Sequence, residues 1–95
     1  MQIDMTQNYH DWESSLKDLL VRARIQARVA RLAAGNPGQY RVLTRGVCEL
    51  KLDFGAGYRV YYTQRDKTLI LLLVGGDKSS QSADIRLAIR LLNNL

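Results

Sequence analysis

The sequence predicts an α+β fold in which two N-terminal helices pack on a small, antiparallel-rich sheet of four to five strands, with a further helix at the C-terminus. Apolar residues recur at helical spacing before residue 35 and again after residue 80. Between these stretches, residues 39–74 consist of short apolar or alternating runs that are separated by polar or glycine-containing turns. Runs joined by such turns form hairpins, so most strand pairs are expected to be antiparallel.

Length and composition describe an ordinary globular chain. It has 95 residues, of which 46% are apolar and 24% are charged, and this length supports one core, so we expect a single domain over residues 1–95. The longest apolar run, residues 69–74, is far shorter than the roughly 20 residues of a membrane-spanning helix. The N-terminus lacks the pattern of a signal peptide, and the only cysteine, Cys48, has no internal disulfide partner. We therefore expect a cytoplasmic protein without a membrane partner.

The chain is basic, which points to an acidic or polyanionic partner. Its 14 lysines and arginines outnumber 9 acidic residues, for a net charge of +5 at pH 7. Such a balance attracts nucleic acids, but small basic domains also bind acidic protein segments. Arg24, Arg28 and Arg31 share one face of the expected helix because their spacings are four and three. They form either a solvated surface or a basic ridge for RNA or an acidic partner.

The N-terminal third predicts an edge strand and a helical hairpin. Residues 2–7 alternate weakly, as a short edge strand does. Residues 9–34 are helical in pattern, with Asn8 as the expected N-cap and the Gly-Asn-Pro-Gly sequence at 35–38 as the stop. One helix of this length would extend about 39 Å, which exceeds the width of so small a domain, so we expect a break near residues 17–21. The buried stripe of the second half consists of Val21, Ile25, Val29 and Leu32.

Four strands and a final helix are expected in the rest of the chain. The strand at residues 68–74 is apolar on both faces, as an interior strand is, and Gly75-Gly76 ends it. Ser79 or Ser80 can cap the helix that follows. The other strands are residues 39–44, 47–54 and 58–63, and the stripe of the final helix is Ile85, Ala88, Ile89 and Leu92.

The hairpin between residues 47 and 63 places polar side chains on one face. If residues 55–57 form a three-residue loop, Asp53 pairs with Arg59, and Lys51 pairs with Tyr61. We expect this face to point to solvent, whereas a bulge in the hairpin would shift the register by one residue and scatter the set. The side chains that it would bring together are those of Glu49, Lys51, Asp53, Arg59 and Tyr61.

Three cations are the candidates for chemistry. The sequence has no glycine-rich phosphate loop, no cysteine pair and no histidine cluster, so neither a metal nor a cofactor is expected. Lys51 and Arg59 share the hairpin face, and Lys78 follows an interior strand beside a helix N-terminus, where free N–H groups favour a phosphate. An ion pair with Asp53 is the rival interpretation of Arg59. A solvated loop position is the rival interpretation of Lys78.

Two segments of the chain resemble the RelE/ParE toxin superfamily of type II toxin–antitoxin modules. Residues 49–62 read ELKLDFGAGYRVYY, and residues 71–81 read LLLVGGDKSSQ. More narrowly, they look like the HigB-like branch, often called addiction module killer proteins. The resemblance covers nearly the whole chain, including Trp12, the Arg-Ala-Arg-Ile sequence at 22–25 and the stop at 35–38.

This resemblance implies a RelE-like fold and an mRNA endoribonuclease that acts on messages in the ribosomal A site and is neutralised by a co-encoded antitoxin, a helix-turn-helix protein. In the family, the arginine of the Tyr-Arg-Val element contacts the scissile phosphate, and Arg59 occupies that position. Lys51 corresponds to the basic residue on the preceding strand, and Lys78 to the one after the Gly-Gly strand end. Further contacts with RNA are expected from Glu49, Tyr61, Ser79, Arg24, Arg28 and Arg31.

These cations suit a metal-independent cleavage in which the ribose 2′-hydroxyl attacks its adjacent phosphate and the 5′-oxygen leaves. Arg59 can offer a two-pronged donor as charge builds on the phosphate. Lys51 would assist the 2′-hydroxyl as a base or electrostatically, with Glu49 as an alternative base. Lys78 would stabilise or protonate the leaving oxygen.

Two other functions fit the same sequence. The superfamily fold also serves ParE-like proteins, which poison DNA gyrase instead of cutting RNA. A chain that only pairs with its antitoxin, for example within a repressor, would need neither Arg59 nor Lys78. Growth arrest with intact mRNA would indicate the first function, and unchanged growth the second.

Overall fold

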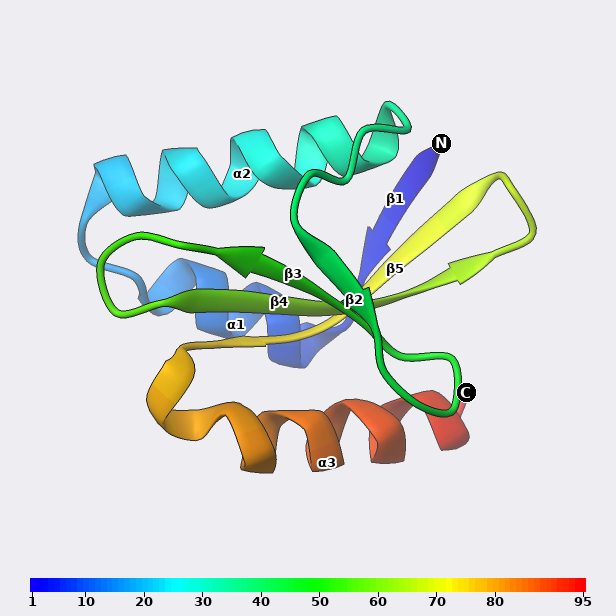
Figure 1. The fold of residues 1–95 in the computed structure, drawn as a ribbon. Helices are drawn as coiled ribbons and strands as arrows, with labels where there is room; N and C mark the ends of the chain where they lie inside the picture. The colour runs from blue at the N-terminus through cyan, green and yellow to red at the C-terminus, as the bar shows by residue number, and fades with distance from the viewer.

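A five-stranded mixed sheet with helices on both of its faces forms the structure (Figure 1). The computed structural model describes residues 1–95. Its elements along the chain are β1 (Gln2–Met5), α1 (Gln7–Ser15), α2 (Leu19–Ala33), β2 (Tyr40–Val42), β3 (Cys48–Leu52), β4 (Tyr58–Arg65), β5 (Leu69–Gly76), the short 3₁₀ helix η1 (Lys78–Ser80) and α3 (Gln81–Asn93). The predicted α+β class, with three helices and a sheet of five strands, is confirmed.

The strands lie in the order β1-β5-β4-β3-β2. β1 pairs with β5 in parallel, and the other strand pairs are antiparallel, so β5 is an interior strand as its apolar sequence predicts. A bulge in β5 turns Leu73 and Val74 toward the same side. β2 is shorter than the predicted 39–44 because a tight turn at Arg45 and Gly46, both at positive φ, takes the chain out of the ladder early.

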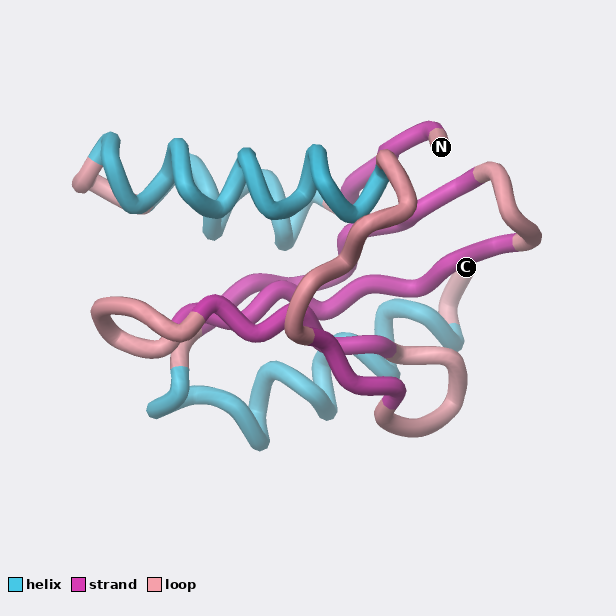
Figure 2. Tube along the Cα trace, turned by 45° about the horizontal axis from the view of Figure 1, so that its top comes forward, coloured by secondary structure: helices cyan, strands magenta, loops and turns pink.

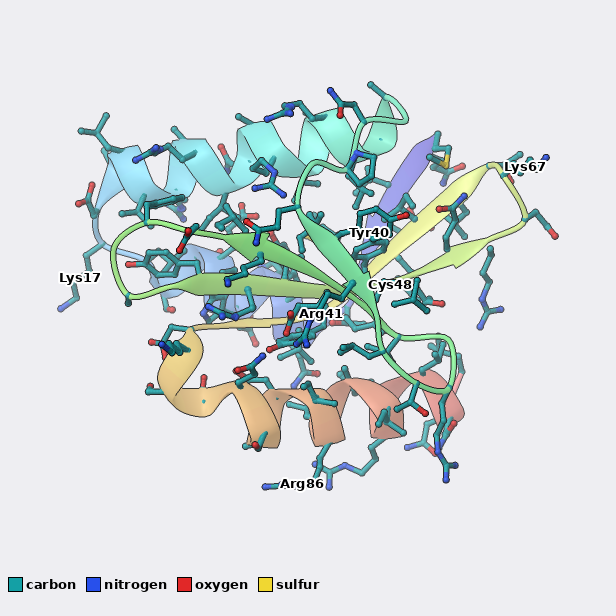
Figure 3. The ribbon with its side chains drawn as sticks, viewed as in Figure 1. Lys17, Tyr40, Arg41, Cys48, Lys67 and Arg86 are labelled. Atoms are coloured by element: carbon teal, nitrogen blue, oxygen red, sulfur yellow. The ribbon has the colours of Figure 1, made fainter.

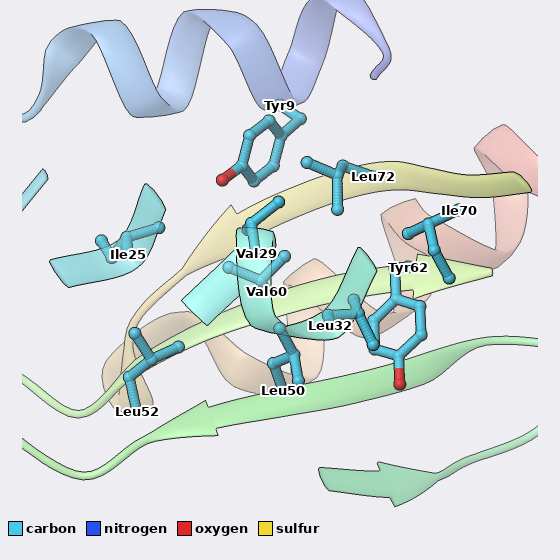
Figure 4. Close-up of a cluster of buried hydrophobic side chains, with 10 residues drawn as sticks. All are labelled: Tyr9, Ile25, Val29, Leu32, Leu50, Leu52, Val60, Tyr62, Ile70 and Leu72. Atoms are coloured by element: carbon cyan, nitrogen blue, oxygen red, sulfur yellow. The ribbon is translucent and has the colours of Figure 1, made fainter. Parts of the chain in front are cut away.

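Helices α1 and α2 cover one face of the sheet, and α3 covers the other (Figures 1 and 2). Under α1 and α2 lies the larger core, where Ile25, Val29 and Leu32 of the predicted stripe meet Tyr9 and apolar residues of three strands (Figure 4). The smaller core under α3 consists of Val47, Tyr61, Leu73, Val74 and Ala88. None of the helices is long and apolar enough to cross a membrane.

The N-terminal helices form the predicted hairpin, with corrections at their ends. Thr6, not Asn8, caps α1: its hydroxyl accepts a hydrogen bond from an amide of the first turn (3.1 Å) and donates one to a carbonyl of β5 (2.6 Å). The cap therefore also fastens the helix to the sheet. The break falls at residues 16–18, at the N-terminal side of the predicted 17–21, because the Asp18 carboxylate caps α2.

The β3–β4 hairpin differs from the predicted register by two residues. Lys51 pairs with Arg59 instead of Tyr61, because the loop spans residues 53–57. The loop is longer than predicted because Phe54 leaves the ladder and packs its ring against neighbouring aromatic and arginine side chains. A shift by two residues leaves each paired side chain on its predicted face of the sheet. The four that still share a face are Glu49, Lys51, Arg59 and Tyr61.

The glycine pair at the end of β5 lets helices approach the sheet closely on both faces. A Cβ atom on Gly75 would overlap the ring of Trp12 in α1, and one on Gly76 would overlap the carboxylate of Asp84 in α3. Neither position has room for a side chain. The two helices and the sheet are therefore in direct contact where β5 ends, immediately before η1.

We expect Gly75→Ala to lower the free energy of unfolding by about 1–3 kcal/mol, because the added methyl group must displace the packed ring of Trp12. Urea denaturation of the full chain measures this change. The control is the same substitution in a Trp12→Ala background, where the penalty should shrink. An unchanged penalty in that background would show that the contact with Trp12 is not its cause.

Candidate anion-binding site

The three cations predicted from the sequence lie around one hollow beside the hairpin loop. Lys51 comes from β3, Arg59 from β4 and Lys78 from η1, and the hollow between them has a volume of about 270 Å³. Lys78 arrives there because Gly76 pairs with Arg59 and because the Lys78 amide donates a hydrogen bond to the Ala56 carbonyl (3.3 Å). The structure thus brings together the three side chains that the sequence singles out.

Arg59 is buried with no carboxylate in contact. Only 6% of its surface is exposed, its Nη1 donates a hydrogen bond to the Gly57 carbonyl, and its Nε has no partner. Neither of the chain's two ion pairs includes it. The expectation that Arg59 points to solvent is therefore wrong. The rival interpretation is not observed either, because Arg59 forms no ion pair with Asp53, which lines the same hollow from the exposed loop. A buried guanidinium in this state favours an anion from outside.

Glu49 is the buried carboxylate of the same face, and both of its oxygens are occupied. It is 1% exposed. Its Oε1 accepts a hydrogen bond from Nε of Arg41 in β2 (3.1 Å) and lies 3.0 Å from Nη2 of the same guanidinium, with which it forms an ion pair. Its Oε2 accepts a hydrogen bond from Nε2 of Gln81 in α3 (2.9 Å). Glu49 therefore joins β2, β3 and α3. It is not placed to act as the alternative base, because neither oxygen is free to reach a ribose hydroxyl.

Tyr61 is fully buried beneath α3, so the expectation that it lies on an open polar face is also wrong. Its hydroxyl has no hydrogen-bond partner. Burial, and then the negative charges of Glu49 and Asp84, raise the pKa of Tyr61, while the positive charge of Arg59 lowers it. Tyr61 therefore remains a neutral phenol that packs in the smaller core, out of reach of RNA.

Ser79 lies in η1 and does not line the hollow between Lys51, Arg59 and Lys78. Its hydroxyl and its amide both donate hydrogen bonds to Oδ1 of Asp77 (2.5 and 2.8 Å). These two bonds hold the pKa of Asp77 below its usual value. The role that the structure gives Ser79 is to order the turn that presents Lys78, because Asp77 is the N-cap of η1.

A second hollow adjoins the first, since Lys51 and Arg59 line both. Its volume is about 260 Å³, and its remaining walls are Gln39, Tyr40, Arg41 and Glu49. Figure 3 shows Tyr40 and Arg41 in front of the sheet, on the strand β2. Sequence analysis missed both residues. The signal that would have found Arg41 is its cross-strand pairing with Glu49, which depends on a register that the sequence does not determine.

The arginines of α2 belong to the other face of the sheet. They line a separate groove of about 360 Å³ between α2 and the hairpin loop. Arg24 lies over the ring of Phe54, with 4.1 Å between its Cζ and the ring centroid, and Arg31 is exposed. Arg28 is half-buried and donates hydrogen bonds to three backbone carbonyls (3.0–3.1 Å), which belong to Lys51, Pro37 and Gln39. The three arginines therefore do not form one continuous basic ridge, because Arg28 binds α2 to β3 and to the segment before β2.

Comparison with known proteins identifies a relative of this chain. The chain is 44% identical over 88 residues to a protein of Haemophilus influenzae described as an uncharacterized protein, and the match covers 93% of this chain and 89% of that one. The chain belongs to the same family as this Haemophilus protein. No protein-family model matches the chain. No solved structure matches it either.

The donor set of this family member suits an anion. Four cationic side chains, those of Arg41, Lys51, Arg59 and Lys78, line the two adjoining hollows. Two carboxylates line them as well: Glu49, which is paired with Arg41, and the exposed Asp53. Elsewhere, no three His, Cys, Asp or Glu side chains gather in a way that could hold a metal ion. Guanidinium and ammonium groups offer only donors, and a phosphodiester offers only acceptors at neutral pH, so the cations suit a phosphodiester or a similar oxyanion.

We expect Arg28→Ala to lower the free energy of unfolding by about 1–3 kcal/mol, because it leaves three carbonyl acceptors without their charged donor. Arg31→Ala removes the same charge from an exposed position of the same helix and should change stability by less than about 0.5 kcal/mol. Thermal and urea unfolding of both variants measures the difference. Equal effects would contradict the structural role of Arg28.

Proposed function

We propose that this chain is the toxin of a type II toxin–antitoxin module, with a RelE-like fold, and that it is an endoribonuclease that cuts translated mRNA. The observation that carries the proposal is Arg59, a buried guanidinium with no carboxylate in contact that lines a hollow together with Lys51 and Lys78. A phosphodiester would supply the missing negative charge. The order of elements and the Tyr-Arg-Val and Gly-Gly-Asp-Lys segments support the same assignment.

The proposed reaction is a metal-independent transesterification within the RNA. The 2′-oxygen of the ribose forms a bond to the adjacent phosphorus while the bond from phosphorus to the 5′-oxygen breaks. The products are a 2′,3′-cyclic phosphate and a 5′-hydroxyl. Negative charge builds on the non-bridging oxygens during this step, and groups that are already oriented toward them stabilise it most.

Arg59 is the residue that we assign to the phosphate. Its guanidinium is held by the Gly57 carbonyl through Nη1, which leaves Nε and Nη2 as a planar pair of donors. A water-poor position strengthens these bonds, because 6% exposure leaves little solvent to screen them. Such donors stabilise the transition state more than the ground state when they bind the phosphate oxygens on which negative charge develops.

Lys51 and Lys78 stand on opposite sides of this guanidinium, on β3 and η1. Lysine amines are normally protonated at neutral pH, so we assign Lys51 an electrostatic role near the 2′-oxygen, whose proton passes to water. Lys78 is exposed and is assigned to the leaving 5′-oxygen, to which an ammonium group can give a proton. Stabilisation by charge thus contributes more to this mechanism than a tuned base.

The partner that we propose besides mRNA is a co-encoded antitoxin of the helix-turn-helix type, in the cytoplasm. The basic balance of the chain, +5 at pH 7, favours a polyanionic or acidic partner in either case. The proposal makes RNA the ligand of the hollow around Arg59. It leaves the groove between α2 and the hairpin loop outside the active site.

We expect brief induction of the chain in bacteria, without the antitoxin gene, to create new mRNA 5′ ends inside translated messages. Arg59→Lys keeps a cation but loses the planar pair of donors, and it should lower the frequency of cuts by roughly 10²–10³-fold. Arg86→Ala is the control, because it removes one positive charge from the exposed side of α3 (Figure 3). It should leave the cuts unchanged.

Three outcomes would contradict this proposal. Wild-type cutting by folded Arg59→Lys protein would remove Arg59 from the reaction. Growth arrest with intact mRNA would favour a poison of DNA gyrase, and no arrest would favour a binding partner without enzymatic activity. Circular dichroism of each purified variant shows whether loss of cutting reflects loss of the fold.

A further inference from the structure

We propose that the second hollow is a further phosphate subsite, in which Arg41 binds the phosphodiester that neighbours the one at Arg59 on the same RNA strand. The buried Glu49 is its positioning residue. This inference rests on the proposed function, which assigns RNA to the first hollow. It adds a residue that neither the sequence nor the resemblance identifies, and it gives Glu49 a role other than that of a base.

The position of Arg41 is the first observation. It lies on the edge strand β2, and its side chain is 60% exposed although the carboxylate that it binds is 1% exposed. Nε and Nη2 bind Oε1 of Glu49, and Nη1 has no hydrogen-bond partner. Arg41 is thus anchored on one edge of its guanidinium and open on the other. An anchored guanidinium loses little conformational entropy when it binds a ligand.

The continuity of the two hollows is the second observation. Lys51 and Arg59 form the wall that they share, with Lys78 on one side and Arg41 on the other. The cations therefore follow one another along a single track from η1 to β2. Single-stranded RNA carries a negative charge at every nucleotide, and grooves that bind it follow the backbone with such a series of cations. An RNA strand that places one phosphate at Arg59 therefore places the neighbouring phosphate at Arg41.

The ion pair between Arg41 and Glu49 differs from an ordinary surface ion pair because Glu49 is buried. A surface pair is mobile and contributes little, whereas this carboxylate is buried and is also held by Gln81 from α3. Its charge is therefore fixed, and it fixes Arg41 in turn. Gln81 gives it a second anchor, so the orientation of Arg41 depends on the position of α3 as well as on β2 and β3.

Binding of a non-cleavable RNA tests this inference. The probe is a fluorescent single-stranded RNA of six nucleotides with 2′-O-methyl groups throughout, and the full chain is titrated at several salt concentrations. Arg41→Ala should weaken binding on the order of tenfold at low salt and reduce the slope of log K against log salt by about 0.7, the value for one phosphate. Arg86→Ala, with the same change of charge, should change both much less.

Two more variants distinguish a positioned arginine from general charge. Arg41→Lys keeps the charge and should still bind several-fold more weakly, because lysine lacks the fork that Glu49 holds. Glu49→Gln removes a negative charge, so a purely electrostatic effect would tighten RNA binding. Positioning predicts the opposite, weaker binding, because Arg41 is then less well oriented. Arg41→Lys is at an exposed position and remains informative if the buried Glu49→Gln variant does not fold.

The outcomes separate this inference from the proposed function. If Arg59→Lys loses affinity while Arg41→Ala behaves like Arg86→Ala, the second subsite is wrong and the first stands. Tighter binding by folded Glu49→Gln protein would overturn the positioning role. If the wild-type chain does not bind the probe at all, the proposed function fails, and this inference fails with it.

Discussion

The packing of α3 across a polar face of the sheet is the constraint on which the site depends. This face carries Glu49, Arg59 and Tyr61, and all three are buried. Tyr61 packs under α3, and Glu49 is bound by Gln81 of that helix. Buried charges are stable only with partners. Glu49 has them in Arg41 and Gln81, whereas Arg59 has a single carbonyl and no carboxylate. Glu49 thus has its charged partner within the chain, whereas Arg59 has none.

The end of β5 determines how closely α1, α3 and η1 pack against the sheet beside the site. Gly75 and Gly76 have no room for side chains, so α1 and α3 contact the strand directly. The chain then turns at once into η1, where the cap by Asp77 holds Lys78 beside the hairpin loop. A larger residue in this pair would move the helices outward and open the hollow. The site and the stability of the fold therefore share the same few residues.

The periodicity of apolar residues predicts most of the helices and strands. It does not predict the strand register or which helix covers which face of the sheet, and the wrong predictions concern these two features. Helical spacing predicts the stripe on α2, and an apolar run predicts that β5 is interior. The hairpin register was two residues off because it depends on where Phe54 packs. Alternation correctly groups Lys51 with Arg59, but it does not say that a helix covers their face. Alternation also does not single out Arg41, whose pairing with Glu49 depends on the strand register.

The arginines of α2 show the same distinction between pattern and surroundings. Arg24, Arg28 and Arg31 have equivalent spacing, yet one stacks on a ring, one binds carbonyls and one is exposed. A count of positive charges would assign all three to a nucleic acid. Charge that is already used within the chain is not available to a ligand. Arg59 differs from all three because it is buried, has no carboxylate in contact and keeps its Nε without a hydrogen-bond partner.

Phosphate binding by Arg59 can be observed directly through the ¹⁵N NMR signal of its Nε–H group. The signal is assigned with Arg59→Lys and followed while the 2′-O-methylated RNA is added. This group is buried and has no partner in the chain. We expect its signal to shift as the RNA binds, while the signal of Arg86 stays in place. Binding of the RNA with an unchanged Arg59 signal would contradict the claim that this guanidinium holds the phosphate.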